Sequence, residues 1–396
     1  MSRPLRMVLA SHLASRRAPT GAERSLALLA AALAQRGHDV TVLLPGEWVL
    51  AGRLRDAGVR LVTVPSRPCW LTYWEARPWP LVAWKALRCL LAERAVGRLQ
   101  RAMLALAPDV VLVNCLPHRP AATAARRARL PFLWHLREIL PAGRRRRWWV
   151  GVLRRSGAGL LAVSEAVRAW VREDDPFLPV HVVYNGVEIP EVTPDPGAAR
   201  EALQLPRGGV WVGYLGQLAP HKGVHLVLAA AAARHDEELR VLVAGFGTRR
   251  QQRQVEEAAR TLLGDRCVVL PPRAAVGPLL AACDIVCVPT LTPDPAPRVV
   301  LEAMAAGRVV IGARCGGIPE LIQDGETGVL LPATSVAALA TALAEVAGDT
   351  AARRRLGEAA RARAAAHFRL ERHVEVMEAL LRERSQAVTT QAGRDR

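Results

Sequence analysis

Short apolar runs rich in Val, Leu and Ile recur along the whole chain and alternate with longer stretches of helical periodicity. Such near-continuous runs are typical of strands that are buried on both faces of a parallel sheet. In the first half, these runs predict strands at 6–11, 39–45, 60–65, 110–114, 131–136, 160–164 and 181–185. In the second half, they predict strands at 211–216, 240–245, 267–271, 284–289, 309–313 and 328–332. Between the first two strands, Leu26, Leu29 and Leu33 share one face of a helix that ends near Gly37.

The strand series restarts after "NGVEIPEVTPDPG" at 185–197, whose Pro, Gly and Glu content predicts a linker. The 396 residues are enough for two domains of roughly 100–200 residues each. The chain is therefore predicted to be an α/β protein with two doubly wound, Rossmann-like domains that face a cleft, where the ligand meets the carboxyl ends of the strands. We expect these domains at 1–188 and 189–366, a last helix at 367–384, and a disordered tail at 385–396.

The charge is strongly positive, with 54 Lys plus Arg against 36 Asp plus Glu and a net charge of +18. Such a charge attracts nucleic acid, anionic lipid or phosphorylated ligands, although a general bias toward arginine explains it equally well. Nucleic acid is not an expected partner, because the sequence has no recognisable recognition helix or zinc spacing. Tryptophans interleave with basic residues at Trp70, Trp74, Trp79 and Trp84 and in "RRRRWW" at 144–149. This pattern favours an anionic membrane surface, but the tryptophans could also pack inside the first domain.

The expected location is the cytoplasm, with a peripheral position at the inner face of the membrane as a further possibility. The seven cysteines are odd in number and contain no CxxC pair, which indicates reduced thiols. The apolar runs are too short to span a bilayer, and the first residues do not resemble a signal peptide.

Lysine occurs at only two positions, Lys85 and Lys222. The second lies in "GQLAPHKG" at 216–223, at the turn between a predicted strand and the helix that follows. A lysine there offers a compact, mobile charge to a diphosphate, with three donors and a short reach. The alternative is a solvated surface lysine, which is less expected in a chain that otherwise uses arginine.

A second candidate site follows the strand at 284–289. Pro297 suits the first position of a helix, and Gly307 suits its end. Backbone amides at a helix start have no partner within the helix, so they form a natural anion site. The amides expected to be unpaired are those of Arg298, Val299 and Val300.

Two acids flank these amides, Asp294 in the preceding loop and Glu302 one turn inside the helix. Together they could grip the hydroxyls of a sugar or ribose while the amides take phosphate. A helix-capping Asp and an exposed Glu are the structural alternative.

The first half offers weaker candidates. Gly21 follows the first strand, where a glycine lets backbone approach a ligand closely. His135 in "WHLRE" lies at the end of a strand, and a single histidine there can be catalytic or structural.

These stretches together resemble the retaining glycosyltransferases of family 4, which have the two-domain GT-B fold. The resemblance covers nearly the whole chain, from "GAERSLALLAAALAQRGHDVTVL" through "AVSEAVR", "VVYNGVE", "LGQLAPHKGVHLVL" and "LLAACDIVCVPT" to "DPAPRVVLEAMAAGRVVIGARCGGIPELIQDGETGVLLP". It implies a hexosyltransferase-type enzyme that takes a nucleotide-sugar donor mainly on the second domain and an acceptor on the first. It also implies retention at the anomeric carbon, with no metal ion or cofactor required. A role in polysaccharide biosynthesis, with a glycan or lipid-linked acceptor, is the corresponding expectation.

The resemblance also implies roles for single residues. Lys222 contacts the donor diphosphate, Glu302 holds the ribose hydroxyls, and the amides around Val299 hold phosphate. Gly21 approaches the donor or acceptor from the other domain, and His135 matches a histidine near the reacting sugar. The helix at 367–384 matches one that crosses back to the first domain.

Two positions depart from the family pattern. The first of its paired acids is usually glutamate and is Asp294 here, which shortens the reach by one methylene. Gln217 stands where the family usually has an arginine beside the lysine, and Arg298 is a candidate to supply the missing charge. An epimerase or hydrolase that acts on sugar nucleotides remains the alternative function, because fold does not fix function. The donor base, the sugar and the acceptor stay open.

Overall fold

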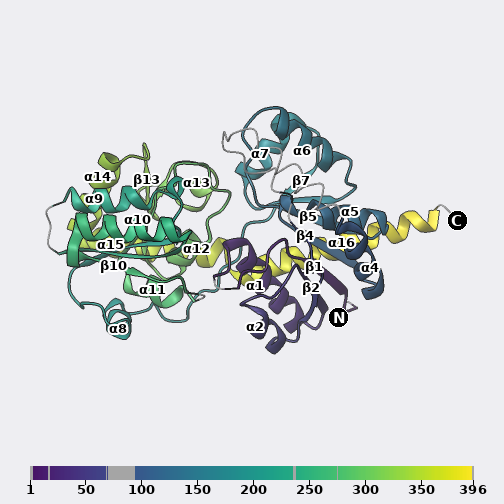
Figure 1. Ribbon diagram of the computed structural model, residues 1–396, viewed down its shortest axis with the longest axis horizontal. Coiled ribbons are helices and arrows are strands. Elements are labelled where there is room, and N and C mark those ends of the chain that lie inside the picture. Colours follow the sequence, from purple (N-terminus) through teal and green to yellow (C-terminus); the bar gives the residue numbers. More distant parts are fainter. Residues whose placement is uncertain are drawn as a thin grey trace. The chain divides into compact units, whose positions relative to one another are not determined.

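The computed structural model divides the chain into two compact units (Figure 1). The first comprises Met1–Asn185 and Glu371–Arg396, and the second comprises Gly186–Leu370. The division falls at the start of the linker that composition indicates. The residues that the structure describes are 3–16, 18–67, 69, 94–234, 238–273 and 275–394, with side chains up to 387.

The first unit is built on a seven-stranded parallel sheet in the order β3-β2-β1-β4-β5-β6-β7. Its strands are β1 (Arg6–Ala10), β2 (Asp39–Leu44), β3 (Arg60–Thr63), β4 (Val110–Asn114), β5 (Phe132–Leu136), β6 (Gly159–Ala162) and β7 (Val180–Val182). The chain order reverses between β1 and β4, so the crevice at their carboxyl ends is the expected ligand position of this fold.

Helices connect the strands of this sheet. They are α1 (Gly21–Gln35), α2 (Ala51–Asp56), α4 (Val96–Leu106), η1 (Leu116–His118), α5 (Arg119–Arg127), α6 (Arg144–Arg154) and α7 (Glu165–Asp174). The predicted first helix is present, and a capping box fixes its start because Thr20 and Glu23 each bond the other's backbone N–H.

The second unit repeats this design with a six-stranded parallel sheet in the order β10-β9-β8-β11-β12-β13. Its strands are β8 (Val210–Gln217), β9 (Leu239–Phe246), β10 (Cys267–Leu270), β11 (Ile285–Val288), β12 (Val309–Ala313) and β13 (Val329–Leu331). Each strand that the apolar runs predicted is therefore present, and the prediction of two doubly wound α/β domains is confirmed. The order reverses here between β8 and β11.

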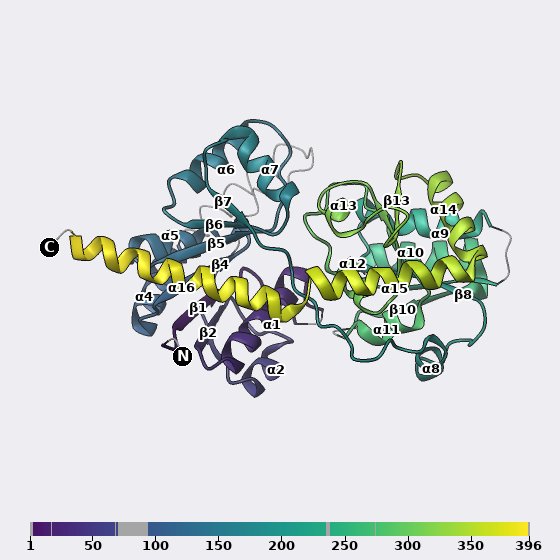
Figure 2. The ribbon, with the colours of Figure 1, turned by 180° about the vertical axis from the view of Figure 1, so that it is seen from behind.

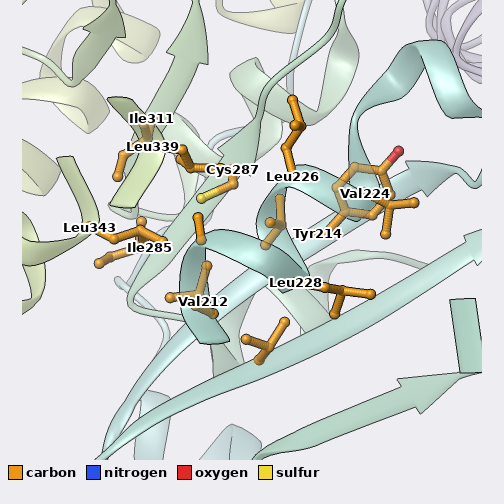
Figure 3. Close-up of a cluster of buried hydrophobic side chains, with 14 of the residues drawn as sticks. Val212, Tyr214, Val224, Leu226, Leu228, Ile285, Cys287, Ile311, Leu339 and Leu343 are labelled. Carbon is orange, nitrogen blue, oxygen red and sulfur yellow. The ribbon is translucent and has the colours of Figure 1, made fainter. Parts of the chain in front are cut away.

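The helices of the second unit are α8 (Pro196–Ala202), η2 (Pro220–Lys222), α9 (Val224–Ala232), α10 (Arg249–Leu263), η3 (Gly264–Arg266), α11 (Gly277–Ala282), α12 (Arg298–Ala305), α13 (Ile318–Leu321), α14 (Val336–Gly348) and α15 (Thr350–His367). A buried core lies between the sheet and α9 and α14, and Figure 3 shows part of it, including Tyr214, Leu226 and Leu343. This core makes β8 and β11 a rigid base for the loops that follow them.

The last helix differs from the predicted one. Instead of a helix at 367–384, α15 ends at His367, and a separate helix, α16 (Leu370–Arg394), begins after a short break. It continues to Arg394, through most of the tail that we expected to be disordered (Figure 2). In the break, Arg369 forms a bridge with Val187 of the linker.

The C-terminal helix belongs to the first unit. Glu378 of α16 accepts a hydrogen bond from Arg36 at 2.8 Å and lies 3.2 Å from His38. Arg382 donates to the carbonyl of Arg3 at 3.0 Å. Within the described residues, no helix is long and apolar enough to cross a membrane.

Candidate functional site

Two predicted site residues of the second unit meet where its strand order reverses. Lys222 lies in η2, just after β8, and Asp294 lies in the loop between β11 and α12. The Lys222 ammonium and the Asp294 carboxylate form an ion pair with Nζ and Oδ2 2.6 Å apart. Their side chains are 26% and 15% exposed, so a ligand can still reach them. The carboxyl ends of β8 and β11 thus bring together two residues that are 72 positions apart.

Close backbone packing fixes the two loops that carry this pair. Gly223 has φ +79°, and a Cβ there would lie 2.2 Å from the carbonyl oxygen of Pro289. The amide of Leu291 donates to the carbonyl of His221 at 2.8 Å. Only glycine combines that φ with that approach, so the sequence "HKG" is needed for the loops to meet.

The loop after β12 holds Asp294 from the other side. The amide of Gly317 donates to the Asp294 carbonyl at 2.8 Å. Gly316 has φ +61°, and a Cβ there would lie 2.2 Å from the same carbonyl oxygen. The Asp294 backbone is therefore positioned before any ligand arrives.

Gln217 ends β8, and its carbonyl accepts a 2.6 Å hydrogen bond from the Tyr214 hydroxyl. Burial, and then the nearby negative charge of Asp294, raise the pKa of Tyr214 well above its ordinary value. The hydroxyl therefore stays protonated and anchors the end of β8. The side chain of Gln217 is exposed.

The start of α12 differs from the predicted arrangement. The amide of Val300 donates to the carbonyl of Pro297 at 3.1 Å, so the expectation of three unpaired amides is wrong at Val300. A 3₁₀-type bond of this kind is a common way to satisfy the first turn of a helix. Val299 follows Arg298 in that turn.

Arg298 and Glu302 form an ion pair one turn apart, with Nε and Oε1 separated by 3.1 Å and both side chains nearly buried. Arg298 also donates to the carbonyl of Gly186 at 3.1 Å. The guanidinium that we considered as a substitute for an arginine at Gln217 is thus directed toward Glu302 and the linker. The pair orients the Glu302 carboxylate.

In the first unit, Gly21 begins α1, and its carbonyl accepts a hydrogen bond from Ser25 at 3.0 Å. His135 lies within β5 and is only 1% exposed. Burial, together with the charges of Arg137 and His373, lowers the pKa of His135 well below its ordinary value, so its imidazole is neutral. The structure does not bring His135 to an exposed surface.

Just beyond β5, Arg137 is only partly buried and so is better placed than His135 to meet a ligand, and the buried Glu138 beside it holds the backbone; the sequence did not single out either residue. Arg137 donates to Asn114 Oδ1 at 2.9 Å and to Asn185 Oδ1 at 2.7 Å. The buried carboxyl of Glu138 accepts the backbone N–H groups of Leu116 and Arg137. The signal was present in "WHLRE": the apolar run ends at Leu136, so the next polar residues lie at the carboxyl edge.

Comparison with known proteins identifies the family. Residues 197–363 match the family described as "Glycosyl transferases group 1", and residues 19–190 match "Glycosyltransferase Family 4". Glycogen synthase of Mycobacterium tuberculosis is 30% identical over 376 residues, covering 88% of this chain and 87% of that protein. The chain belongs to the family 4 glycosyltransferases.

Other relatives of this glycosyltransferase match it over shorter regions. D-inositol 3-phosphate glycosyltransferase of Kribbella flavida is 34% identical over 194 residues, which is 46% of each chain. The matched region thus spans about half the length of that relative. The crystal structure of Anabaena HepE in complex with UDP and glucose has a TM-score of 0.79 at 23% identity, covering 95% of this chain and 99% of that one. This likeness shows the fold.

Proposed function

We propose that this glycosyltransferase moves a hexose from a nucleotide-diphosphate donor to an acceptor, with retention at the anomeric carbon. The observation that carries the proposal is the Lys222–Asp294 ion pair at the reversal point of the second sheet. When the bond between the sugar carbon and the phosphate oxygen breaks, negative charge develops on the departing diphosphate. The Lys222 ammonium is the cation placed to stabilise it.

The pairing with Asp294 suits that role. An ammonium has three donors, so Lys222 can keep one hydrogen bond to Asp294 and direct the others to phosphate oxygens. Asp294 in turn can accept from a hydroxyl of the donor sugar. Because Asp294 holds the ammonium in place, less side-chain entropy is lost when the donor binds.

Glu302 and the first turn of α12 serve the nucleotide in this proposal. The carboxylate, oriented by Arg298, holds the ribose hydroxyls, and the amides near Val299 take a phosphate oxygen. Gln217 contributes a neutral hydrogen bond from the end of β8, so the diphosphate charge is balanced mainly by Lys222.

We propose UDP-glucose as the donor to test first. HepE is described with UDP-glucose, and glycogen synthase is a relative across most of the chain. A ligand at a hundred times its Kd stabilises a protein by about 2.7 kcal/mol, so a true donor should raise the melting temperature measurably. UDP-, GDP- and ADP-linked sugars should be compared on the wild type and on Lys222→Ala.

The expected result is a clear rise with one class of nucleotide in the wild type and a smaller rise in Lys222→Ala. Arg354→Ala is the matched control, since Arg354 is an exposed cation that pairs with Glu358 on α15 rather than on the loops that hold Lys222 and Asp294. Equal stabilisation of the wild type and Lys222→Ala by every nucleotide sugar would contradict the donor site.

We further propose that α6 lies against an anionic membrane surface, which suits a lipid-linked acceptor. Its Arg144, Arg147 and Trp148 are exposed, and the guanidinium of Arg119 lies 5.4 Å from the Trp148 ring centre. Cations beside tryptophan fit the headgroup region of a bilayer. The segment with Trp70, Trp74, Trp79 and Trp84 lies outside the described residues.

The structure sharpens the test of this surface. Arg146 points inward and pairs with Glu173 and Asp174 at 2.6 and 2.8 Å, so its replacement would disturb α6 itself. Arg144→Ser/Arg147→Ser leaves that pair intact. Each arginine near an anionic surface is worth about 1 kcal/mol, so the loss of two should lower the affinity for phosphatidylglycerol vesicles roughly thirtyfold.

The matched control is Arg249→Ser/Arg253→Ser, which removes the same charge from α10 of the second unit and should leave vesicle binding unchanged. Pure phosphatidylcholine vesicles should bind neither variant nor wild type strongly. A wild-type protein that ignores phosphatidylglycerol at low salt would overturn the membrane proposal and favour a soluble acceptor.

A further inference from the structure

The end of β4 contains a strained residue. Cys115 has φ +73° and ψ 146°, close to a region that glycine alone populates freely. Its side chain is buried, at 1% exposure. A residue with a Cβ keeps such a backbone only when its surroundings hold it there, and strain of this kind gathers at functional sites.

Neighbouring segments hold both backbone groups of this residue. The Cys115 amide donates to the carbonyl of His135 at 2.9 Å. The indole N–H of Trp134 donates to the Cys115 carbonyl, also at 2.9 Å. The loop after β4 is thus bonded to β5, the next strand of the sheet.

Glu138 connects the loop after β4 with the loop after β5. Its Oε2 accepts the Leu116 amide at 2.9 Å and the Arg137 amide at 3.0 Å. The side chain is only 3% exposed. Burial raises the pKa of Glu138 to about 7, against the lowering effect of the two amides and of the Arg137 charge.

The loops that Glu138 joins form the carboxyl edge at the reversal point of the first sheet. The register pairs Asn114 with His135, so β4 and β5 end side by side. Arg137 donates to Asn114, and Asn114 donates to the carbonyl of Ala22 in α1 at 3.3 Å. Displacement of the Cys115–Leu116 turn would therefore move Asn114, Arg137 and the start of α1 together.

We propose that Glu138 is a positioning residue of the acceptor side, which holds the strained Cys115–Leu116 turn and, through it, the carboxyl edge of the first sheet in the geometry that transfer requires. This inference rests on the proposed function. A small displacement of substrate-positioning groups can lower a rate about a hundredfold, so even a modest change in this turn should be visible.

The first experiment compares Glu138→Met with Glu138→Gln. Methionine has nearly the same length but no strong acceptor, so the amides of Leu116 and Arg137 lose their partner. Glutamine keeps a carbonyl oxygen that can accept both. We expect Glu138→Met to lower transfer of glucose from UDP-glucose about ten- to a hundredfold, measured with whichever of glycogen, inositol 3-phosphate and a lipid-linked glycan the wild type accepts. Glu138→Gln should retain most of the wild-type rate. If kcat of the wild type changes with pH near 7, that change should be absent in Glu138→Gln, because glutamine does not titrate.

Asp109→Ala is the matched control. Asp109 also accepts a backbone N–H, that of Arg6 at 2.7 Å, but it lies at the opposite end of β4, away from the carboxyl edge. The Asp109→Ala variant should have a lower urea midpoint of unfolding and an unchanged transfer rate. UDP binding, measured by titration calorimetry, should be the same in all three variants, because the donor residues lie in the second unit.

The second experiment tests the strain itself. Glycine adopts the Cys115 backbone readily. In a Cys115→Gly background, Glu138→Met should therefore lower the transfer rate by a clearly smaller factor than it does in the wild-type background. The same reduction should appear in the shift of the urea midpoint.

The outcomes separate this inference from the proposed function. If the wild type transfers glucose and Glu138→Met does so equally well, the positioning role is overturned while the function stands. Equal rate losses from Glu138→Met in the two backgrounds would show that Glu138 does not act through the strained turn. A wild type that neither binds a nucleotide sugar nor transfers from it would overturn the proposed function instead.

Discussion

The reversal points of the two sheets have the same topology but differ in how far their polar groups are buried. In the second unit, a partly exposed ammonium and carboxylate meet, Lys222 and Asp294. In the first, the corresponding edge holds histidines that burial keeps neutral, with pKa values of about 3 for His12 and about 4 for His118. The difference is one of exposure: the second edge carries a partly exposed ion pair, whereas in the first edge the guanidinium of Arg137 donates to Asn114 and Asn185 beside the buried histidines.

The largest expected effect tests the charged side of this comparison. Lys222→Ala should lower kcat for transfer by about 10²–10³, the usual cost of removing one donor from developing charge. Lys222→Arg should also be impaired, because the longer planar guanidinium cannot reproduce the 2.6 Å contact with Asp294 in the same space. Steady-state kinetics at saturating donor measure both. Near-normal turnover in Lys222→Ala would remove the charged edge from the chemistry.

A somewhat smaller effect should separate the two acids of the second unit. Glu302→Gln should raise the KM for the donor with little change in kcat, because a ribose contact contributes equally to ground and transition states. Asp294→Asn should mainly lower kcat, because it loosens Lys222. An unchanged KM in Glu302→Gln would show that the Arg298–Glu302 pair serves the fold rather than the donor.

The buried histidines of the first unit predict a pH-dependent stability. Because the pKa of His118 is lower in the folded protein, the unfolded chain binds more protons between about pH 4 and 6.5. The free energy of unfolding should therefore fall as the pH drops through this window, by about 1.4 kcal/mol per pH unit for each such histidine. His118→Gln should flatten the decline, as measured by urea unfolding at several pH values.

Glu138 provides the contrast. Its raised pKa means that the folded state binds more protons between pH 4.5 and about 7, so stability from this group is present below pH 4.5 and lost as the pH rises through 7. Glu138→Gln should remove this opposing slope and make the acid-side decline steeper. Identical pH profiles for the wild type and both variants would show that neither group is buried as described.

The smallest effect concerns the hydrogen bond that anchors the end of β8, next to Lys222. Tyr214→Phe removes the hydrogen bond to the Gln217 carbonyl and should destabilise the second unit by about 1 kcal/mol. A small rise in the donor KM should accompany it, because Gln217 ends the strand that leads to Lys222. Urea unfolding and donor titration measure the two effects, and a larger kinetic than thermodynamic effect would give Tyr214 a more direct role.

Much of the fold could be read from the sequence, because buried parallel strands leave an apolar signal that does not depend on their neighbours. The sequence also singled out Lys222 and Asp294 as candidate site residues, one by its rarity and one by its place before a helix. The ion pair between them was not predicted, since a contact across 72 positions depends on which strands lie side by side. The direction of the Arg298 guanidinium was not predicted for the same reason. Its partner Glu302 is one helical turn away, but its second partner, the Gly186 carbonyl, is distant in the sequence.

The sequence by itself determined the two series of strands, the linker and the family, because periodicity and motifs are local properties of the chain. Tertiary structure alone decided which polar residues share an edge and what protonation state they hold. His135 shows the distinction: the strand that contains it was predicted correctly, yet its imidazole is neutral because the surrounding fold buries it and because the charges of Arg137 and His373 lower its pKa further. Desolvation is set by the whole surrounding fold, so only the folded chain reveals it.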